Sequence, residues 1–298
     1  MCKRAPIKKK CKRKKPKKPI APVPEPEPAA PEVNVENMSF GCDLVKQSEL
    51  LLAGIAEMGG LPALHSPAAL QRSLHRYELF LSMLSTVLAE EGIKAAGQLL
   101  PPVDVAHAWR AHLIRPQVYR EDCRAMFDRI LPCSVLFCDF GANGVPTKAE
   151  LEETSKAKWE AVVAKEEIPD MPYHPCDADS ALPGDLPPVE VQLNVGHLQE
   201  DIKWWESFSS GWGQEYAANK TEFISSRLLS YKQFLIDSAK SIKQAEQCGV
   251  PEEDTSGPPV DVDLVWHCHM MQPTYDSDLL STIGTVFFHR PAADPECQ

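Results

Sequence analysis

Two segments of the chain repeat one pattern of residue types at a constant distance. PVDVAHAWRAHLIRPQVYRED (102–122) and PVDVDLVWHCHMMQPTYDSD (259–278) share Pro, Val, Asp, Val, Trp, His and Pro at an offset of 157 residues. A tyrosine and an aspartate continue the match after a one-residue deletion, which gives the pairs Asp104/Asp261, Trp109/Trp266, His112/His269, Pro116/Pro273, Tyr119/Tyr275 and Asp122/Asp278. Chance does not easily produce such a run, so it predicts two copies of one module of roughly 100 residues.

The residues before each signature have the periodicity of amphipathic helices. Ser66-Pro67 is typical of a helix start, and apolar residues follow it at spacings of three and four up to Leu88. The same rhythm recurs from Thr221 to about Ile242, and an offset of 154 relates Leu70, Leu74, Tyr77 and Leu81 to Ile224, Leu228, Tyr231 and Leu235. Each module therefore reads as a helix, a long helix, a signature helix and a short helix.

These patterns predict an all-α fold of two diverged helical repeats packed together. We place the first repeat at residues 39–138, a connector with one helix (148–165) at 139–188, and the second repeat at 189–298. Residues 1–38 are expected to form a disordered tail, because they are Lys-rich first and Pro-rich afterwards.

The signature residues have structural interpretations on a helix of about three turns that ends before the proline. Asp104 and Asp261 follow Pro-Val and precede an apolar stretch, which is typical of N-cap residues. A Trp and a His three positions apart share a helix face, and a tryptophan in a helix usually anchors a core. The histidines would then bond to a buried carbonyl or carboxylate. Alternatively, His112 and His269 line a cleft between the modules as ligands or acid/base groups.

The second copy carries ionisable groups that the first copy lacks. Asp263, His267 and Cys268 stand where the first copy has alanine, arginine and alanine. Asp263 and His267 are four positions apart, so they could share a metal ion or pair with each other. His267 and His269 lie about 200° apart on a helix. A transition-metal site at Asp263, His267 and His269 is therefore weighed against a structural role, and no residue is assigned to catalysis.

Charge is divided unevenly along the chain. The formal net charge is −11, but the first 20 residues contain 11 Lys and Arg and no acid, so the remainder carries −22. An acidic body repels nucleic acid on average. Association with nucleic acid, anionic lipid or an import receptor is thus expected through the tail only, by way of Lys8, Lys9, Lys10, Lys12, Arg13, Lys14 and Lys15.

Several classes of protein lack their usual sequence support. No run of about 18 apolar residues and no secretion signal occurs, so we expect neither a membrane protein nor a secreted one, but a protein of the cytoplasm, the nucleus or both. The ten cysteines form no C-x-x-C pair, which favours reduced thiols. P-loop, dinucleotide-binding, nucleophile-elbow and H-E-x-x-H patterns are absent from the sequence.

The second signature resembles a known family. Its DVDLVWHCHMMQPTYDSD stretch is similar to the D-[IV]-D-x-[VI]-W-H-x-H block, followed by Pro, Tyr and Asp, of the glycine-rich domain-containing protein-like family. The likeness extends to the first copy, to RYELFL and SYKQFL, and to the connector with Trp159 and PDMPY, over roughly residues 40–290. It implies a helical domain of uncertain biochemistry, in plants linked to development and stress responses. The chain has only 15 scattered glycines, so nothing attributed to a glycine-rich region is carried over.

The sequence as a whole favours a non-catalytic helical interaction module that presents a cleft or an acidic face to an unidentified protein partner. This interpretation requires no cofactor. The first alternative is a metal-dependent enzyme or metal sensor, and the second is association with nucleic acid through the tail.

Overall fold

The computed structural model describes residues 34–58, 66–142, 144–166, 171–174, 188–248 and 258–288. The chain divides into two units, Met1–Glu32 and Val33–Gln298, and all described residues belong to the second. The basic residues of the predicted tail therefore lie outside the described residues.

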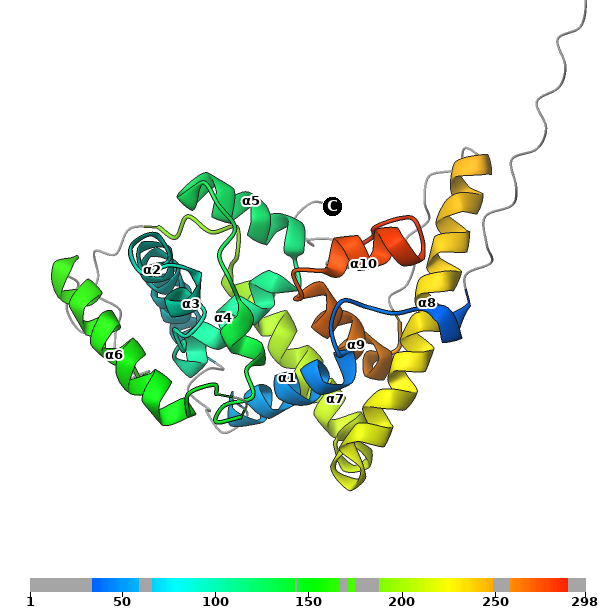
Figure 1. Ribbon diagram of the computed structural model, residues 1–298, viewed down its shortest axis with the longest axis horizontal. Coiled ribbons are helices and arrows are strands. Elements are labelled where there is room, and N and C mark those ends of the chain that lie inside the picture. Colours follow the sequence, from blue (N-terminus) through cyan, green and yellow to red (C-terminus); the bar gives the residue numbers. More distant parts are fainter. Residues whose placement is uncertain are drawn as a thin grey trace, which may run out of the picture. The chain divides into compact units, whose positions relative to one another are not determined.

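Every regular element of the described residues is helical, so the predicted all-α fold class is confirmed (Figure 1). The elements are η1 (Val35–Asn37), α1 (Leu44–Met58), α2 (Pro67–Glu90), α3 (Ile93–Ala96), α4 (Val103–Leu113), α5 (Pro116–Phe127), η3 (Ser134–Phe137), α6 (Lys148–Lys165), α7 (Val195–Ala218), α8 (Lys220–Cys248), α9 (Val260–Met270) and α10 (Tyr275–Thr282). None of these helices is both long enough and apolar enough to span a bilayer.

Local capping explains where several helices begin and end. Ser66 caps α2 by accepting a hydrogen bond from the backbone N–H of Ala69 at 3.1 Å. Thr147 and Glu150 form a reciprocal capping box at the start of α6. Helix α5 ends at Asp128, whose φ of 56° lies in the left-handed region that stops a helix. These signals are local, which is why the sequence predicts these helices well.

The folded part begins earlier than the sequence predicts. Residues 34–38, which the prediction places in the tail, include η1, and the Met38 side chain is only 4% exposed. The Nζ atom of Lys232 on α8 donates to the carbonyl of Met38 at 2.6 Å. Because this contact joins residues 194 positions apart, no local pattern announces it.

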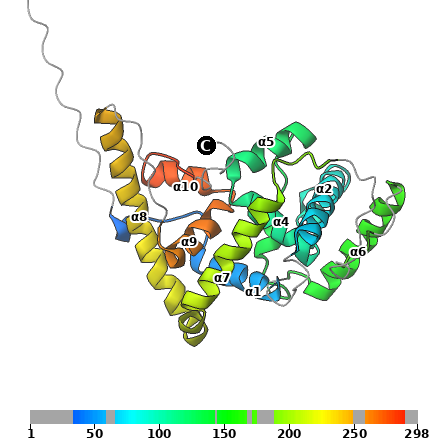
Figure 2. The same cartoon turned by 180° about the vertical axis from the view of Figure 1, so that it is seen from behind.

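The first helix of each predicted repeat packs against helices of both halves. The long and signature helices pair as α2 with α4 and as α8 with α9. Helix α1 packs on α8 and α9 and also on α4 of its own half, whereas α7 packs on α2 and α4 and also on α8 and α9 of its own half (Figures 1 and 2). The duplication itself stays a prediction, and this matched set of contacts supports it. The halves share one core, since each contributes a helix to the other.

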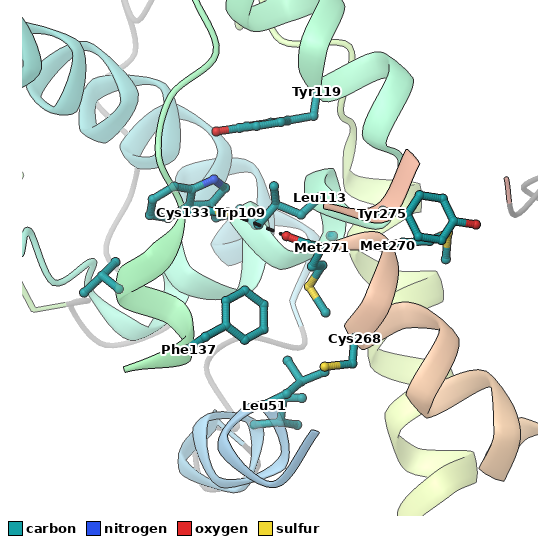
Figure 3. Close-up of a cluster of buried hydrophobic side chains, with 14 of the residues drawn as sticks. Leu51, Trp109, Leu113, Tyr119, Cys133, Phe137, Cys268, Met270, Met271 and Tyr275 are labelled. Atoms are coloured by element: carbon teal, nitrogen blue, oxygen red, sulfur yellow. Dashed lines mark hydrogen bonds between the residues drawn. The ribbon is translucent and has the colours of Figure 1, made fainter. Parts of the chain in front are cut away.

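The core is continuous across the two halves. In Figure 3, Leu51 of α1, Trp109 of α4, Phe137 of η3 and Cys268 of α9 converge from separate helices. All four side chains are buried within one hydrophobic cluster. Burial of a side chain the size of leucine contributes about 1.5–3 kcal/mol, so this shared cluster makes the separation of the halves costly.

Candidate functional site

The first signature histidine is held in a buried chain of three polar side chains. His112 is fully buried, and its Nδ1 lies 2.9 Å from the hydroxyl of Tyr77 on α2. Its Nε2 lies 3.3 Å from a carboxylate oxygen of Asp122 on α5. The ring thus lies between the two groups, with Nδ1 at the tyrosine hydroxyl and Nε2 facing the Asp122 carboxylate at ion-pair distance. Both ring nitrogens are therefore occupied by neighbours of the same chain.

The second signature histidine repeats this arrangement. The hydroxyl of Tyr231 on α8 lies 2.8 Å from Nδ1 of His269, and Nε2 lies 3.1 Å from Oδ2 of Asp278 on α10. The ring of Phe40 packs edge-on against His269 with a centroid distance of 4.5 Å. Burial lowers the pKa of His269, although the hydrogen bond and charge of Asp278 oppose this shift. The imidazole is thus held in its neutral form at neutral pH.

Each signature aspartate also fastens a segment that leads into a helix of the other predicted repeat. Asp122 accepts hydrogen bonds from the backbone N–H of Gln192 at 2.6 Å and from its side-chain amide at 2.8 Å. Gln192 lies just before α7. Asp278 accepts from the backbone N–H of Gly41, just before α1, with both oxygens at 3.0 Å. These carboxylates therefore hold the segments that lead into α7 and α1 against the signature residues.

The signature tryptophans and tyrosines act as packed anchors. Trp109 is fully buried, and Trp266 is 3% exposed. The indole N–H of Trp266 donates to the hydroxyl of Tyr275 at 2.9 Å, and that hydroxyl donates to the carbonyl of Phe287 at 2.6 Å. Tyr119 makes the matching bond in the first half, to the carbonyl of Leu131 at 3.0 Å. These contacts agree with the core-anchor interpretation.

The prediction that Asp104 and Asp261 are N-caps is wrong. The caps of α4 and α9 are Pro102 and Pro259, and each aspartate lies in the first helical turn without a capping bond. Their carboxylates pair with arginines of the long helices instead. Nε of Arg76 lies 2.6 Å from Asp104 Oδ2, and Nε of Arg227 lies 2.7 Å from Asp261 Oδ2. These partners lie 28 and 34 positions away, so capping rules alone do not reveal them.

The three residues considered for a metal do not meet at one point. Nε2 of His267 lies 3.3 Å from Oδ2 of Asp263, and the indole N–H of Trp204 on α7 donates to the same oxygen at 2.7 Å. His269 instead contacts Tyr231 and Asp278. The described residues contain no group of three or more His, Cys, Asp or Glu side chains placed to hold a metal ion.

The additional groups of the second copy are buried. Burial lowers the pKa of His267 to about 4, with only partial opposition from the charge of Asp201. Burial likewise raises the pKa of the Cys268 thiol to about 12. A neutral imidazole and a protonated thiol in the core have the properties of structural groups rather than of a nucleophile and its base.

Sequence reasoning missed a polar contact between α4 and α7. Nδ1 of His107 lies 3.2 Å from Oδ2 of Asp201, and both side chains are almost fully buried. Burial alone would raise the pKa of Asp201, but the neighbouring His107, together with the charges of His267 and Arg110, outweighs it and lowers this pKa. His107 does stand in the signature segment, but nothing in the sequence pairs it with a residue of α7.

A hollow open to solvent lies where the two signature helices end. This groove has a volume of about 540 Å³. Its lining is mainly apolar but includes three charged side chains: Leu88, Ile93, Leu113, Pro116, Tyr119, Arg120, Arg124, Ile130, Leu131, Pro132, Cys133, Met270, Met271, Gln272, Pro273 and Asp276. Of the twelve signature residues, it includes Pro116, Tyr119 and Pro273. Neither signature histidine lines it.

An ion pair joins the two halves at the groove. Nη1 and Nη2 of Arg120 on α5 lie 2.5 Å and 2.9 Å from the two carboxylate oxygens of Asp276 on α10. Both residues directly follow the signature tyrosine, so they hold matching positions in the two copies. The Sγ atom of Cys133 also contacts the carbonyl of Met271 at 3.6 Å, drawn as a dashed line in Figure 3. The groove floor is thus built from both halves.

The fold and site define a class: an all-helical protein with paired, buried Tyr–His–Asp contacts and a groove between its halves. The glycine-rich domain-containing protein-like family matches residues 27–122, which confirms the resemblance expected from the signature.

Two relatives from Arabidopsis thaliana are similar to the chain. Glycine-rich domain-containing protein 2 is 24% identical over 263 residues, covering 85% of this chain and 30% of that protein. Glycine-rich domain-containing protein 1 is 25% identical over 234 residues, covering 76% and 26% respectively. The chain thus spans less than a third of the length of either relative. No solved structure matches the chain.

Proposed function

We propose that the helical part of this chain is a non-catalytic module that binds a partner protein through the groove between its halves. One observation carries this proposal. The histidines and aspartates of both signatures contact each other inside the protein, whereas the groove presents apolar and cationic side chains to solvent. A partner can therefore reach the apolar and cationic side chains of the groove, but it cannot reach the histidines of the signature.

Burial argues against catalysis by the signature histidines. His112 and His269 have no exposed surface, and both ring nitrogens of each already contact a tyrosine and an aspartate. A general base has to come within hydrogen-bond reach of its substrate. No such approach is open without dismantling the core around these rings.

The groove has the properties of a recognition surface. Ile93 and Ile130 are 71% and 42% exposed, although both are large apolar residues. Adjacent apolar side chains that stay in water mark binding sites more often than isolated ones do. The volume of about 540 Å³ also falls within the usual range of ligand-binding clefts. A partner side chain that entered the groove would contact both halves of the module.

The comparisons support a modular role. The matched region makes up only 30% and 26% of the two Arabidopsis relatives, as expected for one module of a longer chain. We place the protein in the cytoplasm or the nucleus, with the Lys-rich residues 3–18 directing its localisation.

Site-specific photo-crosslinking tests the proposal. Ile130 is replaced by the photoreactive amino acid p-benzoylphenylalanine in the full chain, which is then expressed in the cells that contain it naturally and irradiated. The expected result is a discrete crosslinked partner, identified by mass spectrometry, that an excess of unmodified protein competes away.

The matched control places the same amino acid at Leu229 on α8, which is 60% exposed and lies outside the groove. The partner should be absent from this sample. Equal crosslinking from both positions, or no crosslinked protein from Ile130, would contradict a partner site in the groove.

A further inference from the structure

The charges around the groove indicate what kind of partner segment it accepts. Arg120 and Arg124 are four positions apart on α5, so they lie on one face of this helix. The Asp276 carboxylate neutralises Arg120 through two hydrogen bonds. Arg124 is exposed and, among the described residues, forms no ion pair. One side of the groove therefore carries an uncompensated positive charge.

This charge runs against the balance of the rest of the chain. Beyond the first 20 residues the chain carries a formal charge of −22, so a cationic edge beside an apolar groove is a local exception. The exposed side chains of Ile93 and Ile130 lie on the groove that Arg124 borders. Complementary charge steers association and selects against wrong partners.

We propose that the groove binds an acidic amphipathic segment of the partner protein. Its large apolar side chains enter the groove, and its carboxylates face Arg124 on the α5 side. This inference rests on the proposed function and adds the chemistry of the partner segment. The Arg120–Asp276 pair sets how much positive charge the groove offers, because Asp276 competes with a partner carboxylate for Arg120.

A random 12-residue peptide library displayed on phage is the probe. Selection against the full chain should enrich peptides that combine two or three large apolar residues with Asp or Glu. Fluorescence anisotropy then gives the affinity of the enriched peptides for the protein. Arg124→Glu should weaken binding by about tenfold, because an attraction becomes a repulsion. Raising the salt concentration should weaken binding to the unmodified protein as well.

A second variant makes the test specific to the ion pair. Asp276→Asn removes the carboxylate that neutralises Arg120, so an acidic peptide should bind about two- to fivefold more tightly. A purely structural role of the pair predicts weaker binding instead. Thermal unfolding by circular dichroism verifies that both variants remain folded.

The inference is overturned if no peptides are enriched or if the enriched peptides show no excess of acidic residues. It is also overturned if a folded Arg124→Glu variant binds these peptides as tightly as the unmodified protein does. Crosslinking from Ile130 reports on the partner site whatever the partner's charge. A crosslinked partner together with peptides of neutral or basic composition would thus refute this inference and leave the proposed function standing.

Discussion

Replacement of Arg76 by methionine should destabilise the protein more than the corresponding change of Arg227. Arg76 is 1% exposed and donates to Asp104 at 2.6 Å and to the carbonyl of Tyr173 at 2.6 Å. In Arg76→Met, the Asp104 carboxylate stays buried without its cation. Removal of one partner of a buried ion pair costs about 3–5 kcal/mol. We therefore expect the free energy of unfolding to fall by that amount.

The second half of the molecule supplies the matched control. Arg227 pairs with Asp261 at 2.7 Å, but their side chains are 16% and 12% exposed. Water screens this pair and partly solvates the aspartate that Arg227→Met leaves behind. Because its burial lies between that of surface and core pairs, we expect a loss of about 1–2 kcal/mol.

Urea unfolding followed by circular dichroism at 222 nm measures both losses, and unchanged slopes indicate that the transitions are comparable. The double variant Arg76→Met/Asp104→Leu should regain a large part of the stability, because no unpaired charge remains in the core. Equal losses for Arg76→Met and Arg227→Met would refute this reasoning. So would a double variant no more stable than Arg76→Met.

Three further predictions follow from the buried contacts. Tyr77→Phe and Tyr231→Phe should each lower the free energy of unfolding, measured in urea, by about 1–3 kcal/mol, because a buried histidine nitrogen loses its hydrogen-bond donor. Losses below about 0.5 kcal/mol would argue against these hydrogen bonds. His267 has a pKa of about 4 in the folded protein and 6.5 ordinarily, so its contribution is complete above pH 6.5 and is lost as the pH falls towards 4. His267→Gln should therefore decline less steeply in stability over this pH range, and identical slopes would count against the prediction. A chain cut within residues 175–187 should yield two pieces that fold only when co-expressed, because α1 and α7 each pack against helices of the other half; cooperative unfolding of either piece alone would contradict this.

Helix positions were predictable because their signals are local. The Ser66 cap and the apolar rhythm after it place α2, and the predicted connector helix 148–165 matches α6. The prolines Pro116 and Pro273 limit the signature helices to 11 residues each. Spacing and capping suffice for such features, since they depend on neighbours within a few positions.

The sequence predicts the hydrogen-bond partners of the signature residues less well than it predicts the helices. A buried carboxylate or carbonyl was expected for the histidines, and Asp122 and Asp278 do lie beside His112 and His269. The tyrosine of each long helix was visible only as a matched apolar position. Nothing local showed that its hydroxyl reaches a signature histidine, because this depends on how the long and signature helices pack.

The asymmetry between the copies indicates chemistry at the sequence level, whereas the structure uses these residues for packing. Asp263 and His267 suggested a metal site, yet Asp263 accepts from Trp204 of α7, and the ring of His267 packs at a tilt of 41° against the same indole, with ring centroids 4.7 Å apart. The contact between α7 and α9 explains these polar residues. Trp204 and Asp263 are 59 positions apart in the chain, so no local pattern reveals their contact.

The signature maintains the architecture, and the groove binds the partner. Crosslinking from Ile130, combined with thermal unfolding, tests this directly in two variants. Tyr231→Phe should lower the melting temperature and, where it is still folded, keep the crosslinked partner. Arg124→Glu should keep the melting temperature and lose the partner. Loss of the partner in a fully folded Tyr231→Phe variant, with Arg124→Glu still binding, would contradict the account.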